Sequence, residues 1–214
     1  MKLPEIRPFS WTLKQLESAH TEVNLLSTGQ TELIIKHDLI KGVTTDMLLW
    51  WFENFARLSV TISGTTYPAY HLWHPKDHIM VRIQKEKLHQ GDTIHIHECF
   101  QRNIKYQIDD KTRVAYLNQD GIELHGYKMG LCALRLRHEF TDTDQGVQYN
   151  SRMLIGLEKG PLRRFVNSVV IPRKFSPDKA KAWLQHNVEE VGCFENFLKV
   201  LYGKKNEVPN IIMK

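Results

Sequence analysis

The chain has 214 residues, of which 42% are hydrophobic and 25% charged, and its formal net charge is +5 at pH 7. This length and composition are typical of one globular domain with a substantial core. Its basic residues form isolated doublets such as Arg163-Arg164 and Lys204-Lys205. The clustered charge of a nucleic-acid-binding protein is therefore missing.

The cysteines and the apolar runs of the sequence indicate the cellular compartment of the protein. The three cysteines, Cys99, Cys132 and Cys193, are odd in number and form no CxxC pair. This favours a reducing compartment over a disulfide framework. The first residues lack the apolar core of a signal peptide, and no apolar run approaches the ~20 residues of a membrane span. We expect a cytoplasmic protein without a membrane partner.

The first third of the chain predicts few regular elements. Residues 1–30 are expected to be irregular, with one helical turn at 12–18. A strand is predicted over 33–40. Thr44 or Thr45 can cap a helix that runs to about 54 and is apolar enough to be buried. A loop rich in Gly, Pro, Tyr and His is expected from 59 to 78.

From residue 79 onward the alternation of apolar and polar residues predicts antiparallel strands. The predicted strands are 79–83, 93–100, 104–108, 113–117, 122–127, 131–140 and 147–157. Two turn sequences, at 118–121 and 142–146, indicate hairpins. Ser176-Pro177-Asp178 then begins a helix of about 26 residues, which Gly203 ends, and 204–214 are expected to form a loose tail.

This order of elements predicts an α+β, helix-grip fold, in which a curved antiparallel sheet wraps around a long C-terminal helix. We expect a single domain over residues 1–214, with a core of about 30–202. Such an arrangement leaves a cavity between sheet and helix that suits a small, partly apolar ligand.

The C-terminal helix carries a pair of metal-binding residue types. His186 and Glu190 lie four residues apart, so their side chains project from the same side of the helix. They fall at the edge of its apolar arc, whereas Glu189 falls on the polar side. A metal-free ion pair at the helix edge is the alternative reading of the same spacing.

Glu98 belongs to an apolar strand face. Strand alternation places it with Ile94, Ile96 and Phe100, and places His95 and His97 on the opposite face. An unpaired carboxylate in an apolar wall costs several kcal/mol, so it requires a cation or a proton. A zinc ion is one answer, and pairing with an arginine such as Arg82 is another.

The segment from His74 to His78 supplies two further imidazoles. His78 directly precedes the strand 79–83, and alternation turns its side chain away from the inward set of Ile79, Val81 and Ile83. We therefore prefer His74 as a ligand and keep His78 as the alternative. The resulting set is His74, Glu98, His186 and Glu190, whose nitrogen and oxygen donors suit zinc, manganese or iron.

The same residues carry a resemblance to a known family. GVTTDMLLWWF at 42–52, YHLWHPKDH at 70–78, Glu98 and the His186–Glu190 pair occur in this order. Together they resemble the 2,4-diacetylphloroglucinol hydrolase family, which includes phloretin hydrolase, over about residues 30–202. The resemblance implies a Bet v 1-like domain that binds Zn²⁺ through two His and two Glu, here His74, Glu98, His186 and Glu190.

The implied reaction is hydrolysis of the carbon–carbon bond between an acyl group and a phenolic ring, with a small phenolic ketone as substrate. The resemblance also implies residues that hold the substrate. These candidates are Tyr67, Tyr70, Asp77, His138 and Tyr149. Among them His138, Tyr149 and Asp77 are the candidate catalytic groups. The competing hypothesis is a metal-free helix-grip protein that binds a small apolar or aromatic ligand. A homodimer is compatible with either hypothesis.

Overall fold

The computed structural model describes residues 3–213, and within them the strands form two sheets. The larger sheet has nine antiparallel strands, in the order β1-β2-β11-β10-β9-β8-β7-β6, with β3 paired to β11. Its strands are β1 (His20–Leu25), β2 (Thr31–Lys36), β3 (Ile40–Lys41), β6 (His78–Arg82), β7 (Thr93–Cys99), β8 (Gln107–Asn118), β9 (Gly121–Lys128), β10 (Leu131–Thr143) and β11 (Gly146–Ile155). The smaller sheet contains β4 (Ser59–Ile62), β5 (Thr65–Pro68) and β12 (Asn210–Met213).

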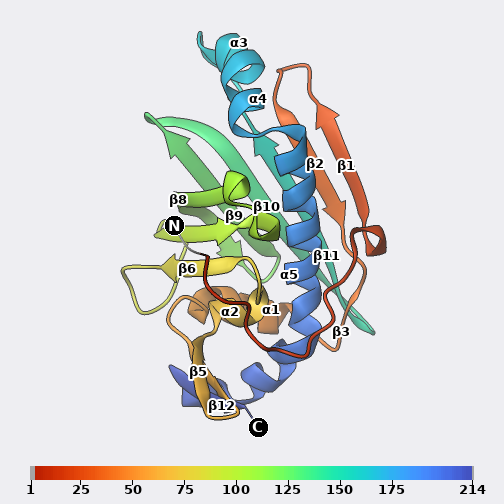
Figure 1. Ribbon diagram of the computed structural model, residues 1–214, viewed down its shortest axis with the longest axis vertical. Coiled ribbons are helices and arrows are strands. Elements are labelled where there is room, and N and C mark those ends of the chain that lie inside the picture. The colour runs from red at the N-terminus through yellow and green to blue at the C-terminus, as the bar shows by residue number, and fades with distance from the viewer. Residues whose placement is uncertain (1–2, 214) are drawn as a thin grey trace.

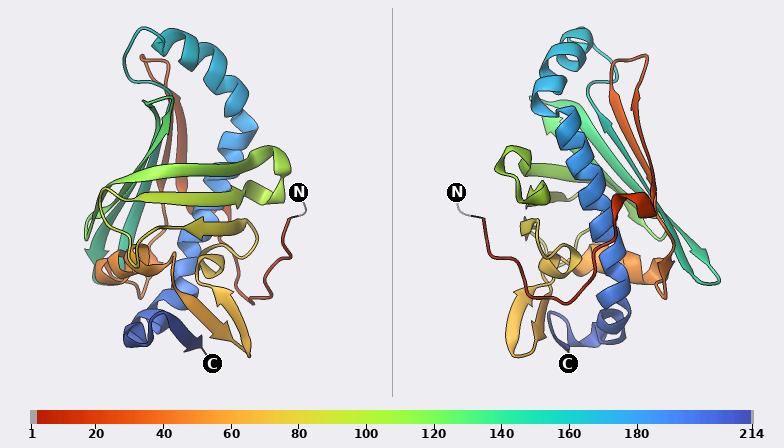
Figure 2. Two further views of the ribbon diagram at one scale, coloured as in Figure 1. Left: turned by 90° about the vertical axis from the view of Figure 1, so that its left-hand side faces the viewer. Right: turned by 45° about the vertical axis from the view of Figure 1, so that its right-hand side comes forward.

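The large sheet curves around the long helix α5 (Pro177–Gly203). Strands at its β1 end run along α5, whereas strands at its β6 end cross it (Figures 1 and 2). This arrangement is the helix-grip, Bet v 1-like fold that the sequence predicts. The N-terminus of α5 also agrees with the prediction, because the Ser176 hydroxyl accepts a hydrogen bond from the Lys179 amide at 3.2 Å.

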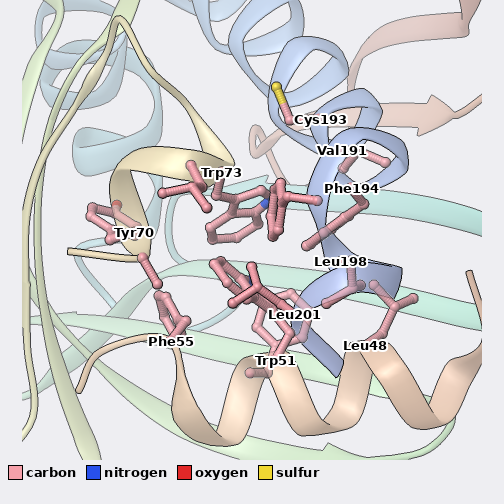
Figure 3. Close-up of a cluster of buried hydrophobic side chains, with 14 of the residues drawn as sticks. Leu48, Trp51, Phe55, Tyr70, Trp73, Val191, Cys193, Phe194, Leu198 and Leu201 are labelled. Carbon is pink, nitrogen blue, oxygen red and sulfur yellow. The ribbon is translucent and has the colours of Figure 1, made fainter. Parts of the chain in front are cut away.

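Aromatic residues fill the core beside the C-terminal half of α5. They come from α1 (Thr45–Asn54), which Thr44 caps, and from α2 (Tyr70–Trp73). Figure 3 shows Trp51 and Trp73 packed against Phe194 and Leu198. A second cluster packs the N-terminal half of α5 on β2 and β11. The two clusters hold the helix along its whole length against the sheet.

The two chain ends are more ordered than predicted. Residues 20–25 form edge strand β1, although the sequence analysis assigned 1–30 to an irregular extension. The strand is mostly polar, and Val23 and Leu25 are exposed, so no inward apolar pattern marks it. Strand β12 lies in the predicted loose tail, where it pairs in parallel with β4 and buries Ile211. Residues 1, 2 and 214 of these predicted segments lie outside the described residues.

Three internal segments also differ from the prediction. The predicted loop 59–78 contains β4, β5 and α2. Residues 104–106 form a 3₁₀ turn instead of a strand, because the Asn103 side chain accepts from the Lys105 amide and caps the turn. A helical segment that the sequence analysis did not identify connects β11 to α5. Its parts are α3 (Arg163–Phe165), a π-helical turn (Val166–Val170) and α4 (Ile171–Lys174). None of the helices in residues 3–213 has the length and apolarity needed to cross a membrane.

Candidate metal centre and cavity

A β-bulge brings His78 to the same face of the sheet as Glu98. His78 pairs directly with Glu98 in the ladder between β6 and β7, and the register then shifts before Met80, which pairs with His97. The extra residue reverses the alternation, so His78 shares its face with Val81 rather than opposing it. The expectation that His78 points away from the inward set was wrong for this reason.

Four side chains converge where this strand pair meets α5. His78 Nε2 lies 3.5 Å from Glu98 Oε1 and 3.3 Å from Glu190 Oε2. His186 Nε2 lies 3.7 Å from an oxygen of each glutamate. We refer to His78, Glu98, His186 and Glu190 as the four-residue cluster. Both histidines and Glu190 are buried, and Glu98 is nearly so.

Hydrogen bonds at the opposite ring nitrogens orient both imidazoles. His78 Nδ1 lies 2.8 Å from the Tyr70 carbonyl oxygen, which can only accept, so Nδ1 carries the proton. His186 Nδ1 lies 3.1 Å from Asp77 Oδ2 and donates to this carboxylate in the same way. In the neutral rings, each Nε2 therefore presents a lone pair to the two glutamates. Histidines that bind a metal commonly donate their other ring N–H to a carbonyl or carboxylate oxygen in this way.

The cluster is electrostatically uncompensated unless a cation or protons occupy it. Burial raises the pKa of Glu98, and burial together with Glu98 raises the pKa of Glu190 to about 8. Burial opposes the charged form of His186, but the Asp77 hydrogen bond and the Glu190 and Glu98 carboxylates raise its pKa to about 9. Burial lowers the pKa of His78, whose Nε2 has no hydrogen-bond partner among the described residues.

These residues fit a zinc ion. Two imidazole lone pairs and two carboxylates are a donor set that zinc accepts, and an unpartnered buried nitrogen faces the carboxylates. The Tyr70 hydroxyl donates to Glu98 Oε1, and the amide of Asn187 donates to Glu190 Oε1. Each carboxylate is thus held in place through its Oε1 atom. Glu190 Oε2 lies near both histidines, whereas Glu98 has Oε1 near His78 and Oε2 near His186.

The structure places His74 outside the four-residue cluster. Its Nε2 lies 2.9 Å from Glu189 Oε2, and its Nδ1 accepts a hydrogen bond from the Asp77 amide at 3.1 Å. Its ring stacks on that of His186 at a centroid distance of 4.5 Å. Both of its nitrogens thus have partners within the protein, although His74, Asp77 and His186 also lie close enough together to hold an ion. The bulge takes His78, the alternative ligand of the sequence analysis, to the two glutamates.

Two of the predicted substrate residues lie away from the cavity. Asp77 is buried and accepts hydrogen bonds from the Gln101 and Arg102 amides, in addition to its contact with His186. It therefore orients a histidine instead of facing a ligand. Tyr67 lies in β5, where its ring packs edge-on against Phe9. Neither residue lines the cavity described next.

A cavity of about 70 Å³ adjoins the cluster between the sheet and α5. Its wall combines aromatic and aliphatic side chains with four polar ones. The lining residues are Phe52, Phe55, Trp73, Ile94, Ile96, Glu98, Ile122, Leu124, Leu136, His138, Trp183, His186 and Glu190. Glu98, Ile94 and Ile96 share the inward face of β7, as the alternation predicted.

The remaining predicted residues, Tyr70, His138 and Tyr149, lie in or beside this wall. The Tyr149 ring is 5.3 Å from that of His138, and its hydroxyl is buried without a hydrogen-bond partner among the described residues. Burial lowers the pKa of His138 to about 3 and raises the pKa of Tyr149 well above its usual value. At neutral pH His138 in the wall is therefore a neutral imidazole, and Tyr149 beside it is a protonated phenol.

Sequence reasoning missed three polar residues behind this wall. His37, Ser151 and Asn187 are all nearly inaccessible to solvent. Asn187 directly follows His186, and Ser151 lies on the inward face of β11 with Tyr149 and Met153, so a polar residue on an apolar face was the available signal. His37 lies within the predicted strand 33–40, where alternation places it with Leu33 and Ile35, so the same signal was available for it.

These observations define the class of protein: a helix-grip domain with a buried histidine–carboxylate cluster at the end of an apolar cavity. The family model described as DAPG hydrolase PhiG domain matches residues 24–119, a segment that includes α1, α2, His78 and Glu98. The match confirms the resemblance to the DAPG hydrolase family that the motifs indicated. No curated protein matches the chain.

Several solved structures are similar to this chain over most of its length, at low sequence identity. Protein NE0264 from Nitrosomonas europaea is 9% identical, with a TM-score of 0.49 over 80% of this chain and 96% of its own. Protein Ms6760 from Mycobacterium smegmatis is 11% identical, with a TM-score of 0.44 over 80% and 95%. Ginseng major latex-like protein 151 from Panax ginseng is 9% identical, with a TM-score of 0.44 over 72% and 97%.

Proposed function

We propose that this protein is a zinc-dependent hydrolase that cleaves the carbon–carbon bond between an acyl group and a phenolic, phloroglucinol-like ring. The four-residue cluster at the end of an apolar cavity is the observation that carries the proposal. The family match supports a hydrolase of the acylphloroglucinol type. The apolar wall suits the ring of a small phenolic ketone, and the polar groups beside it suit its oxygens.

In this proposal His78, Glu98, His186 and Glu190 hold the zinc ion. When bound, zinc supplies Lewis acidity, which polarises oxygen atoms and lowers the pKa of water. Asp77 and the Tyr70 carbonyl oxygen orient the two imidazoles, and the Tyr70 hydroxyl and Asn187 orient the two carboxylates. These four hydrogen bonds hold the metal-binding atoms in position in the metal-free protein.

The chemistry requires the ring carbon to leave with the bonding electron pair. A 1,3-dihydroxylated ring allows this in its keto form, in which the carbon that bears the acyl group is protonated. Water adds to the acyl carbonyl, the carbon–carbon bond breaks, and the ring departs as an enolate while the acyl group becomes a carboxylic acid. A neutral His138 can exchange a proton with a ring hydroxyl, and the Tyr149 phenol can donate to an oxygen.

The test is hydrolysis of an acylphloroglucinol by zinc-loaded protein. We expect one equivalent of carboxylic acid and one of deacylated ring per turnover, both detected by liquid chromatography. The matched comparison is a phenyl ester of the same acid, which separates carbon–carbon from ester hydrolysis. Zinc binding at the cluster without acid release from any acylphloroglucinol tested would refute the proposed reaction.

The alternative, a metal-free helix-grip protein that binds an aromatic ligand, also has an observation in its favour. His186 has a pKa of about 9, so a proton on this residue can compensate the buried carboxylates without a metal. Calorimetric titration with zinc distinguishes the two. Binding of roughly one zinc per chain supports the hydrolase, whereas ligand binding without any affinity for zinc supports the alternative.

A further inference from the structure

Three buried polar side chains form a continuous hydrogen-bonded chain behind the cavity wall. His138 Nδ1 lies 2.9 Å from Ser151 Oγ, and the same oxygen lies 2.9 Å from His37 Nε2. All three residues are buried, and His138 reaches the cavity. Because its Nδ1 edge faces Ser151, the edge of His138 that carries Nε2 is the one left for the cavity.

Asn187 contacts the four-residue cluster and also carries a buried hydrogen-bond acceptor. Its Nδ2 donates to Glu190 Oε1. Its Oδ1 is buried and has no hydrogen-bond partner among the described residues. The side chain raises the pKa of His37, against the larger effect of burial, which lowers that pKa to about 3. Asn187 Oδ1 is therefore a buried acceptor that lacks a donor, on a side chain that affects the protonation of His37.

The direction of each hydrogen bond follows from the one before it. A carboxylate only accepts, so Glu190 turns the amino group of Asn187 toward itself and the amide oxygen away. That oxygen requires a donor, which the Nδ1–H of His37 can supply. His37 Nε2 then has a lone pair and accepts from the Ser151 hydroxyl. The Ser151 oxygen in turn accepts from His138 Nδ1–H.

We infer that Asn187, His37 and Ser151 are positioning residues that hold His138 in the Nδ1–H tautomer, so that His138 Nε2 faces the cavity as a hydrogen-bond acceptor. Both imidazoles are neutral at pH 7, because burial lowers the pKa of each to about 3. A neutral ring has one donor and one acceptor, and the serine hydroxyl between them has a single proton. The hydrogen bonds of this series can therefore all run from donor to acceptor in one of two directions. Glu190 determines the direction, because its carboxylate can only accept.

The effect of this tautomer on substrate binding rests on the proposed function. Under that function, the acceptor Nε2 of His138 in the cavity matches a hydroxyl on a phenolic ring. The opposite tautomer would present Nε2–H, which matches a carbonyl oxygen or a phenolate. The relay of Asn187, His37 and Ser151 would thus decide which ring oxygen His138 binds, and in which protonation state. The tautomer itself is independent of turnover and can be measured without substrate or metal.

The test is long-range ¹H–¹⁵N correlation spectroscopy of the protein with ¹⁵N-labelled histidine, which distinguishes protonated from unprotonated ring nitrogens. We expect His138 to carry its proton on Nδ1. In His37→Phe the Ser151 hydroxyl has only His138 Nδ1 to donate to, so we expect His138 to change to the Nε2–H tautomer. His97→Phe is the matched control, because His97 is equally buried but bonds to Gln107 outside the relay.

An Nε2–H tautomer of His138 in the unmodified protein, or an unchanged His138 spectrum in His37→Phe, would overturn the inference. If His37→Phe does not fold, Ser151→Ala and Ser151→Thr give the same decision. The alanine variant removes the hydroxyl between the two histidines, so we expect His138 to be no longer held in the Nδ1–H tautomer. Threonine keeps the hydroxyl, so we expect the Nδ1–H tautomer to be preserved. Far-UV circular dichroism verifies folding of each variant.

Activity provides a second readout. With zinc and an acylphloroglucinol, we expect kcat of His37→Phe to fall on the order of 10²-fold, the scale of a misplaced acid–base group, with KM changed less. We expect Ser151→Thr to retain more of kcat than Ser151→Ala. If the protein binds no zinc and hydrolyses nothing, the proposed function fails while the tautomer measurement still decides the inference.

Discussion

At the residue scale, the identity of the first histidine of the cluster depends on one inserted residue. His74 and His78 both flank the Pro-Lys-Asp segment, and both are completely buried. Of these two residues, His78 is the one with a ring nitrogen that has no hydrogen-bond partner within residues 3–213, and that nitrogen faces Glu98 and Glu190. His74 uses both ring nitrogens within the protein.

This difference predicts opposite effects for two neighbouring substitutions. We expect His78→Ala to reduce zinc binding by at least 100-fold, because it removes one of four donors. We expect His74→Ala to retain about one zinc per chain, with a loss of stability from its broken hydrogen bonds. Elemental analysis and competition with a chromophoric chelator measure both. Zinc lost in His74→Ala and kept in His78→Ala would contradict the arrangement.

At the element scale, the C-terminal helix α5 carries two members of the cluster, His186 and Glu190, and one member of the relay, Asn187. The helix was predictable because its signals are local: a serine cap, a proline in the first turn, and an apolar arc of helical period. Helix α1 was predictable for the same reason. Both matched the prediction to within one or two residues.

We expect Ser176→Ala to destabilise the protein by about 1 kcal/mol, because it removes the acceptor for the Lys179 amide at the first turn of α5. Urea unfolding monitored by circular dichroism gives the change in free energy. Ser168→Ala is the control, since the Ser168 hydroxyl is exposed and bonds to the Arg164 carbonyl oxygen within its own helical segment. A change within ~0.5 kcal/mol is expected there. Equal losses in both variants would exclude a capping role.

Elements that depend on distant partners were not predictable. Strands β4 and β12 are about 150 residues apart in the chain, and neither has a local pattern that marks the pairing. The bulge after His78 is set by the ladder with β7, and strict alternation therefore predicted the wrong orientation for this histidine. The inward position of Glu98 was predictable because β7 pairs with β8 over its full length without a register shift.

At the scale of the whole molecule, burial of histidines links stability to pH. His37 and His138 have pKa values of about 3 when folded and an ordinary value of 6.5. The unfolded chain therefore binds protons that the folded chain does not. The protonation of these two histidines therefore leaves the free energy of unfolding unchanged above pH 6.5 and decreases it as the pH falls toward 3. The decrease amounts to about a few kcal/mol for each histidine.

We expect the melting temperature to fall from pH 7 to pH 4, and to fall less steeply in His37→Phe. The other histidines are common to both proteins, so the difference between the two curves isolates His37. Scanning calorimetry at constant ionic strength measures it, and His97→Phe is again the control. Parallel curves for the unmodified protein and His37→Phe would show that His37 is not held neutral in the fold.

The volume of the cavity has a consequence for ligand kinetics. A space of about 70 Å³ is well below the roughly 300–1,000 Å³ of typical small-molecule sites, so the cavity is smaller than a phenolic ketone needs. We therefore expect such a ligand to bind to molecules in which the sheet and α5 have moved apart. The observed dissociation constant then equals the intrinsic one divided by the fraction of open molecules. A substitution that loosens the aromatic core should tighten binding while it lowers the melting temperature.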